Sequence, residues 1–554
     1  MTPLVGHLVI APVLLPMFAA ALIVALGDQR RPSACRAVSL ANCMALVLAS
    51  IWLLVWAVSN EPAVYVLGNW QAPYGIVLVL DRLSALMVAL TSLLSVATCW
   101  YALRGWDTRG RHFHALLQLQ LMGLNGAFLT GDLFNLFVFF ELLLIASYGL
   151  MLHGGGVARQ RATLHYIVYN LVASTLFLFA AGLLYGVTGT LNMADLSLQV
   201  AAAPIEDATL IRSAGMLLLV VFAIKAAVLP LCFWLQEGYR SASPPVACLF
   251  AVMTKVGLYS ILRVCTLIFG SDAGAGADLA AAWLLPAGIA TLAFAAVGVI
   301  ASRSFGMLVT YLVIASAGSM LVGVGTFSQG GIAAALFYLV HSTLVVALLF
   351  LLAGEIARER GALGSDLLPG PALAAPVRLG VVFLFAGVAA SGLPPVSGFI
   401  AKIGILQGVQ DSPWAYSAWV AILVSSLLTV IALARAGSML FWRAGAGAGV
   451  SASVDGVPAT AMVPLATVPA ASFGPVWLLV VALIALTAGA RPVQSYLDAT
   501  GMQLMSPANY VDAVIRPVQS DRDEEINVDG DRLRAGQPPA GTTSAQHSAY
   551  RTAL

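Results

Sequence analysis

Long apolar segments separated by short polar loops dominate the chain from residue 4 to about residue 491. A helix needs about 20 apolar residues to cross a bilayer, and this rule predicts fourteen membrane spans. They begin near residues 4, 37, 83, 113, 133, 163, 211, 246, 279, 305, 331, 379, 415 and 473. The pattern therefore predicts an all-α polytopic membrane protein.

Two of the predicted spans contain interruptions. The seventh, within residues 221–240, has Lys225 in an apolar run that Pro230 then breaks. The twelfth contains the stretch SGLPPVSGF at 391–399, followed by Lys402. Proline removes a helical hydrogen bond and frees a carbonyl, which a polar cavity can satisfy and lipid cannot. Paired breaks of this kind are typical of inverted-repeat transporters. The lysine precedes the prolines in one break and follows them in the other, so the sequence alone does not establish a repeat.

Composition supports the membrane prediction. The chain is 60% hydrophobic and 9% charged, with a mean hydropathy of +0.92, whereas a soluble domain carries about 25% charged residues. The net charge of +2 gives no reason to expect a nucleic-acid partner. We expect the lipid bilayer to surround most of the chain.

The loops alternate in charge along the chain. One set is rich in arginine: Arg30, Arg31, Arg36, Arg104, Arg109, Arg111, Arg159, Arg161, Arg240, Arg303, Arg358, Arg360, Arg378, Arg435 and Arg443. The intervening set holds acidic residues: Glu61, Asp132, Asp195, Glu206, Asp207, Asp272, Asp278 and Asp411. Basic loops face the cytoplasm, so we expect both termini on the external side.

The three lysines of the chain, Lys225, Lys255 and Lys402, all lie in apolar segments, although the chain has 27 lysines and arginines together. A charged side chain at the centre of a bilayer costs about 2.5 to 3.5 kcal/mol and by default marks a functional site. A desolvated lysine can exchange a proton near neutral pH, which arginine cannot. The alternative is that each lysine lies near a helix end and extends its ammonium to the interface.

Glu141 and His341 are further polar residues inside predicted spans. Glu141, in LFVFFELLLIAS, is a carboxylate deep in its span that could pair with Lys225; the alternative is a protonated acid bonded to a carbonyl. His341, in FYLVHSTLVVALL, titrates near neutral pH and suits a proton relay. A structural histidine with both nitrogens satisfied is the alternative.

No motif for a bound cofactor is present. The sequence lacks GxxxxGK[ST], GxGxxG after a strand, and CxxCH. Its six cysteines have no metal-ligand spacing. We therefore expect no cofactor, no metal, and neither ATP hydrolysis nor redox chemistry in this chain.

The chain resembles the antiporter-like subunits shared by respiratory complex I and the Mrp-type multisubunit cation/proton antiporters. The resemblance runs from about residue 78 to 443, through DRLSALM, GDLFNLFVFFELLLIASYGL, VFAIKAAVLPLCFWLQEGYRSASPPVACLFAVMTKVGLYSILR and SGLPPVSGFIAKIGILQG. It implies about fourteen helices with two inverted five-helix repeats and broken helices 7 and 12. It also implies a relay in which Glu141 lies beside Lys225, followed by Lys255, His341 and Lys402.

This resemblance divides the chain into N-terminal helices 1–3 at 1–105, a first repeat at 106–270 and a second repeat at 271–443. A linker at 444–471, helix 14 at 472–491 and a polar tail at 492–554 follow. The tail begins with an amphipathic stretch at 493–514, and the composition of residues 521–554 predicts disorder.

Within the family, the D-type subunits of the Mrp antiporters are most similar to this chain. The resemblance implies a proton-translocating subunit of a Na+/H+ or K+/H+ antiporter in a bacterial inner membrane, with other integral membrane subunits as partners. One alternative is a proton-pumping subunit of an NADH-quinone oxidoreductase or a membrane hydrogenase. Another is a membrane scaffold that transports nothing.

Overall fold

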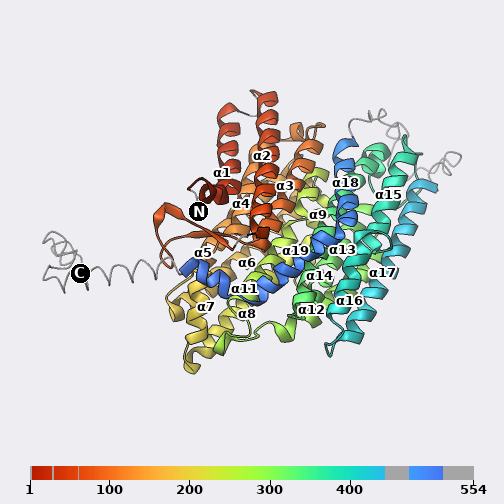
Figure 1. The fold of residues 1–554 in the computed structure, drawn as a ribbon. Coiled ribbons are helices and arrows are strands. Elements are labelled where there is room, and N and C mark those ends of the chain that lie inside the picture. Colours follow the sequence, from red (N-terminus) through yellow and green to blue (C-terminus); the bar gives the residue numbers. More distant parts are fainter. Residues whose placement is uncertain (1–2, 28–29, 60, 443–472, 516–554) are drawn as a thin grey trace, which may run out of the picture.

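The computed structural model describes residues 3–27, 30–59, 61–442 and 473–515, and these form an elongated bundle of helices (Figure 1). One antiparallel hairpin, β1 (Ala63–Val66) with β2 (Val77–Leu80), pairs Ala63 with Leu80 in the loop before the third helix. The predicted all-helical class is thus confirmed, with this small hairpin added to it.

The helices follow the predicted apolar segments. Those of the first half are α1 (Pro3–Leu26), α2 (Pro32–Ser59), α3 (Arg82–Ala102), α4 (Phe113–Leu129), α5 (Leu133–Leu152), α6 (Val157–Thr188), α7 (Met193–Ala202), α8 (Ala208–Ala226), α9 (Phe233–Ser241), α10 (Pro244–Phe250) and α11 (Met253–Leu267). The second half comprises α12 (Ala281–Ala301), α13 (Phe305–Val324), α14 (Gln329–Arg360), α15 (Pro376–Ser391), α16 (Ser397–Gly408), α17 (Ala415–Gly437), α18 (Gly474–Ala488) and α19 (Ala490–Met505).

Eleven helical segments among the described residues are long and apolar enough to cross a membrane, or twelve if the bent pair of α18 and α19 counts as one span. This is fewer than the predicted fourteen. The span predicted near 473 counts only as part of that bent pair, and the two other predicted spans that fall short begin near 113 and 379. They correspond to α4, with 17 residues, and α15, with 16.

Both predicted interruptions separate two helices. Helix α8 ends at Ala226, Ala227 takes a left-handed conformation with φ of 57°, and α9 starts at Phe233. Helix α15 ends at Ser391, Gly392 has φ of 74°, and α16 starts at Ser397. A left-handed residue directly after a helix closes its last turn and redirects the chain. The prolines that follow prevent the helix from continuing.

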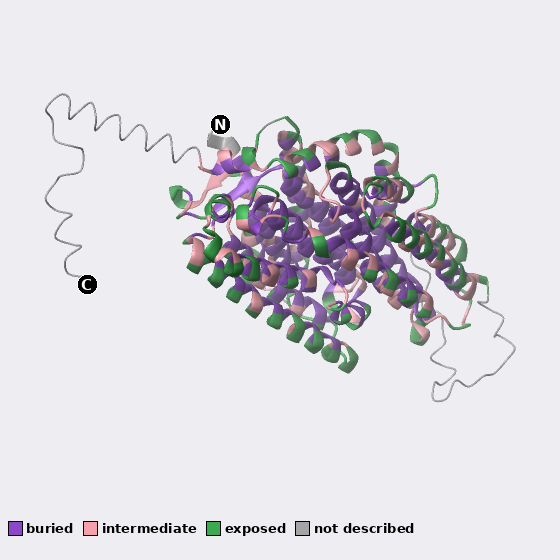
Figure 2. Cartoon of the chain, turned by 90° about the horizontal axis from the view of Figure 1, so that it is seen from below, coloured by how far each residue is buried: buried purple, intermediate pink, exposed green. Residues whose placement is uncertain are grey.

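The most buried helices lie along the middle of the bundle. In the most apolar stretch of each helix, 89% of the residues of α13 and 94% of those of α14 are buried, and in the span formed by α10 and α11 all are buried. In contrast, the corresponding stretches of α2 and α17 are each 33% buried. Figure 2 shows the buried residues in the interior and the exposed ones along the outer helices. The outer apolar faces therefore suit lipid or membrane partners.

The C-terminal region turns back across the bundle. Helix α18 bends by 77° into α19, which crosses the bundle in Figure 1. Tyr496 of α19 donates to the carbonyl of Arg82 at 2.6 Å, and Gln329 donates to the carbonyl of Asp498 at 3.1 Å. Residues 508–515 form one further helical stretch. The predicted amphipathic stretch is therefore helical and packed on the body, while the linker at 444–471 and the tail at 521–554 lie outside the described residues.

Candidate functional site

Lys225 lies at the C-terminal end of α8, two residues before the break. Its Nζ donates a hydrogen bond to Oδ1 of Asn170 in α6 at 3.1 Å and lies 5.8 Å from the ring centroid of Phe140. A cavity of about 20 Å³ adjoins the ammonium, and its lining includes Trp234 and Met253. This is enough room for about one water molecule.

Glu141 lies in the middle of α5. No ion pair within 4 Å joins it to Lys225 in the described structure, and its Oε1 is buried without a hydrogen-bond partner among the described residues. The carboxylate still acts on the Lys225 ammonium through space. The expected direct contact is thus replaced by a bond to Asn170 and a longer-range electrostatic interaction.

Lys255 lies in α11 and is fully buried. Its Nζ donates to Ser316 Oγ of α13 at 2.7 Å and to Thr254 Oγ1 at 3.4 Å. Both partners are neutral hydroxyls, which satisfy the hydrogens of the amine without holding its charge.

His341 lies in the middle of α14, facing the second break. Its Nδ1 is 2.8 Å from Ser397 Oγ, and its Nε2 is 3.1 Å from the carbonyl oxygen of Ala389. A carbonyl only accepts hydrogen bonds, so Nε2 carries the proton, and Nδ1 of the neutral ring accepts from the serine. A Cβ at position 398 would lie 2.6 Å from Nε2, so Gly398 is required for this close approach.

Lys402, in α16, binds a free backbone carbonyl at the C-terminal end of α15. Its Nζ donates to the carbonyl of Ser391 at 2.9 Å and to Ser426 Oγ of α17 at 2.8 Å. Ser391 is the last residue of α15, where free carbonyls carry the negative end of the helix dipole. The ammonium is therefore held at a helix terminus that favours positive charge.

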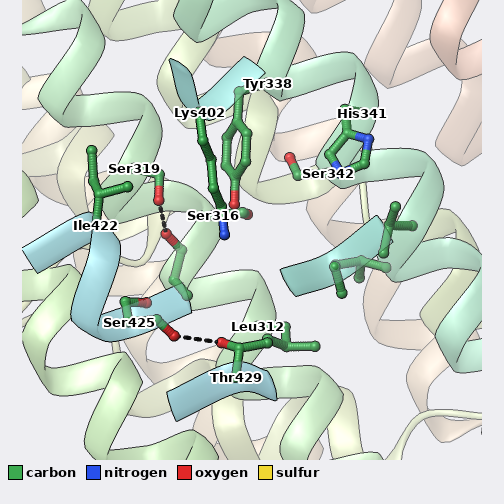
Figure 3. A pocket seen from close by; sticks show the side chains of 14 residues that line it. Leu312, Ser316, Ser319, Tyr338, His341, Ser342, Lys402, Ile422, Ser425 and Thr429 are labelled. Carbon is green, nitrogen blue, oxygen red and sulfur yellow. Dashed lines mark hydrogen bonds between the residues drawn. The ribbon is translucent and has the colours of Figure 1, made fainter. Parts of the chain in front are cut away.

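A second cavity, of about 20 Å³, lies between two of these side chains and the hydroxyl partner of a third. Lys402, His341 and Ser316, the acceptor for Lys255, all line it, together with the hydroxyl-bearing residues Ser319, Tyr338, Ser342, Ser425 and Thr429 (Figure 3). It holds room for about one water molecule. The structure thus places His341 and Lys402 on one polar cavity, which Lys255 reaches only through Ser316, and places Lys225 on another.

Sequence reasoning missed the neutral partners of these groups. Asn170, Ser316, Ser397 and Ser426 are uncharged polar residues in predominantly apolar helices, a pattern shared by many serines in this chain. Gly257 was also missed. A Cβ there would lie 2.4 Å from the backbone nitrogen of Ala226, so only glycine lets α11 pass the end of α8.

Comparison with known proteins identifies the family. Residues 130–432 match the family model described as NADH:quinone oxidoreductase/Mrp antiporter, TM. A protein of Rhizobium meliloti that is named as the D-type subunit of a probable K(+)/H(+) antiporter is 42% identical, covering 93% of this chain and 98% of that protein. The D-type subunit of the Na(+)/H(+) antiporter of Bacillus subtilis is 36% identical, covering 92% and 100%.

A solved structure agrees with the sequence relatives. A chain in the structure of the Mrp complex from Dietzia sp. DQ12-45-1b superposes with a TM-score of 0.81 at 30% identity, covering 93% of this chain and 100% of that one. The family model, the two relatives and the solved structure therefore agree on one family. The chain belongs to the D-type subunits of the Mrp antiporters, within the complex I antiporter-like family.

Proposed function

We propose that this chain is the proton-translocating subunit of a multisubunit monovalent cation/proton antiporter in a bacterial inner membrane. Protons pass along Lys225, Lys255, His341 and Lys402, and Glu141 adjusts the proton affinity of Lys225. The names of the relatives include both K+ and Na+, and either cation fits this proposal. Membership of the family confirms the expectation of a transporter component rather than an enzyme.

The observation that carries the proposal is that buried arginines and buried lysines have different partners. In the described part of the chain, the buried carboxylates of Asp81 and Glu355 are bound by Arg263 and Arg104. The three lysines instead bind amide, hydroxyl and carbonyl oxygens. A lysine without a carboxylate can lose its proton and remain hydrogen-bonded, whereas arginine keeps its charge. The lysines are therefore suited to exchange protons and the arginines to hold structure.

Transfer between the groups requires water. The Lys225 cavity is lined by Met253 and Val256, which flank Lys255 on α11. The second cavity then connects Ser316, His341 and Lys402. His341 can take up and release a proton at Nδ1, which faces the hydroxyl of Ser397, while the Nε2 proton stays bonded to the carbonyl of Ala389. Each step is then a short transfer between hydrogen-bonded groups or through a water molecule.

The two breaks support the proposed inverted repeats at 106–270 and 271–443. After α8, the amide of Val228 donates to the carbonyl of Ala223 and that of Leu231 to Val228. After α15, the amide of Leu393 donates to Val388 and that of Val396 to Leu393, with the same spacing. In each break a left-handed residue precedes this pattern. One repeated backbone turn thus forms in both halves.

The full proposal has fourteen spans, in which α4 and the pair of α15 and α16 also cross the membrane, and both termini are external. A topology reporter fused after Arg109 or Arg161 should then read cytoplasmic, and one fused after Glu61 or Asp207 should read external. An external reading at Arg161 would contradict this arrangement. The proposed partners are the other integral membrane subunits of the same complex, bound on the outer apolar faces.

The experiment that tests transport uses inside-out membrane vesicles containing the whole complex. We expect Lys225→Leu to abolish K+- or Na+-dependent proton release while the protein level stays normal. Lys225→Arg should be equally inactive, because the guanidinium keeps the charge and cannot release it. Wild-type proton release by a well-expressed Lys225→Leu variant would refute the relay and favour a scaffold role.

A further inference from the structure

A cavity outside the proposed relay lies at the arginine-rich end of the bundle. It encloses about 300 Å³ and is formed at helix termini: the end of α9, the start of α10, the start of α6 and the C-terminal turns of α14, together with the loop after α3. This volume is at the lower end of the range for small-molecule sites. None of Glu141, Lys225, Lys255, His341 and Lys402 lines it.

Four arginines line this cavity: Arg109, Arg159, Arg240 and Arg358. No aspartate or glutamate is among its lining residues. No carboxylate lies within 4 Å of the first three in the described part of the chain. Arg358 reaches Glu355 only at 3.9 Å, and Glu355 is already bound by Arg104 at 2.5 and 3.2 Å. The cavity therefore collects positive charge that the protein does not neutralise.

Two of these arginines are held in fixed orientations. The guanidinium of Arg109 lies 3.7 Å from the ring centroid of Trp106, and such stacking leaves the N–H edge of the group free. Arg159 donates from Nε to the carbonyl of Ser241 at 2.8 Å and from Nη1 to that of His153 at 2.6 Å. Both groups are positioned before any ligand binds, which lowers the entropy cost of binding.

We propose that this cavity binds a phosphate-bearing anion, namely the phosphate of an anionic phospholipid headgroup or a free phosphate. Arginine forms paired hydrogen bonds with phosphate oxygens, and basic pockets between membrane helices on the cytoplasmic side suit anionic headgroups. Part of the remaining wall is apolar and comes from α10 and α14, including Ala247, Phe350 and Ala353. An apolar wall beside the charged one fits a lipid, whose glycerol and upper acyl carbons lie next to its phosphate.

A bound anion would join segments that are far apart in sequence. Arg240 lies in the last turn of α9, the second half of the broken helix, and Arg159 lies in the first turn of α6, which carries Asn170, the partner of Lys225. Both contact the same cavity as Arg358 of α14. The site thus lies at the junction of α6, α9 and α14, of which α6 carries the partner of Lys225 and α14 carries His341, although its existence does not depend on transport.

The test uses the assembled complex, purified in a neutral detergent, and measures binding of labelled phosphatidylglycerol and labelled phosphatidylcholine. We expect preferential binding of phosphatidylglycerol, and a loss of about tenfold or more in affinity in the double variant Arg109→Gln/Arg240→Gln. Arg161→Gln is the matched control, because Arg161 is exposed on α6 and lies outside the cavity. It should bind like the wild type.

Competition with inorganic phosphate distinguishes the two sources. If phosphate displaces the labelled lipid, the site accepts a soluble anion; if it does not, the site requires the lipid. Equal binding of the two lipids with no phosphate competition would overturn the proposal, as would wild-type affinity in the double variant. If the double variant does not assemble, Arg240→Gln alone is measured by the same criteria, since Arg240 is exposed.

Discussion

Arg263 of α11 binds Asp81 through two parallel hydrogen bonds, from Nη1 to Oδ2 at 2.6 Å and from Nη2 to Oδ1 at 2.9 Å. Both side chains are buried. Asp81 also caps α3 by accepting from the Ser84 amide at 2.8 Å, and the guanidinium lies 5.1 Å from the ring centroid of Tyr510. The pair therefore connects the start of α3, helix α11, which carries Lys255, and the C-terminal helical stretch at 508–515.

Breaking this pair should destabilise the protein strongly. Burial alone would raise the pKa of Asp81, but the charge and hydrogen bonds of Arg263 hold it below its usual value. We expect Asp81→Asn to lower the stability by about 3 to 5 kcal/mol, because it leaves a buried guanidinium without a counter-charge. The double variant Asp81→Leu/Arg263→Met should recover part of this loss. Thermal unfolding in detergent measures these variants together with the single variants Asp81→Leu and Arg263→Met. A double variant that loses as much stability as Asp81→Leu and Arg263→Met added together would contradict the pairing.

Asn170→Leu should slow antiport, because Lys225 loses the amide oxygen that holds its Nζ. Leucine keeps the branching of the asparagine side chain without its polar atoms, so we expect the protein level to stay normal. Asn170→Ser, which keeps an oxygen at the site, should retain more activity than the leucine variant. Cation-dependent proton release in vesicles provides the measurement, and equal activity in both variants would show that the bond has no role in transport.

Glu141→Gln should abolish antiport even though Glu141 makes no direct ion pair with Lys225 in the described structure. The substitution keeps the shape and removes the charge that acts on the ammonium. The double variant with Lys225→Leu should be no worse than either single variant, since both affect one step. Full activity of Glu141→Gln at normal expression would remove the carboxylate from the mechanism.

The interaction of Asp107 with Arg36 should make stability depend on acid pH. Burial alone would raise the pKa of Asp107, but hydrogen bonds from His114 and Arg36 outweigh it and hold the pKa below 3.8. A lowered folded-state pKa gives stability that is present above the unfolded value and is lost as the pH falls through the folded value. Asp107→Asn should therefore unfold at a lower temperature than wild type at pH 6, and this difference should shrink below about pH 4. A difference that stays constant with pH would contradict the assignment.

Two truncations test whether the packed C-terminal helices are needed for assembly and the residues beyond them are not. We expect a stop after Ser520 to leave salt tolerance nearly unchanged in a strain that depends on this complex, because α19 and residues 508–515 are retained. A stop after Gly489 should abolish assembly, because it removes Tyr496, which donates to the Arg82 carbonyl, and Gln503, which accepts from the Arg82 amide. Immunoblots of membranes report the protein level. Loss of assembly in the longer form would show that residues after 520 are needed.

The apolar periodicity of the sequence was sufficient to locate the helices and the two interruptions, because span length and proline chemistry are local properties. It also identified the buried amines, since a charge in an apolar run is visible in sequence. It could not predict that Lys225 binds Asn170 rather than Glu141. That choice depends on the relative positions of α5, α6 and α8, which tertiary packing sets. Similarly, the docking of α19 depends on contacts with residues that are distant in sequence, such as Arg82, which lies 414 positions before Tyr496.

The bend between α18 and α19 has a consequence for the surrounding lipid. Helix α18 has 15 residues and is about 22 Å long, whereas the hydrocarbon core of a bilayer is about 30 Å thick. A hydrophobic helix this short is accommodated by local thinning of the bilayer, by snorkelling of its flanking residues or by association with other helices. Thr487, near the C-terminal end of α18, accepts from the Ser397 amide at 3.0 Å, and Ser397 in turn contacts His341. A change in membrane thickness that shifts α18 would therefore be felt at His341 through Ser397.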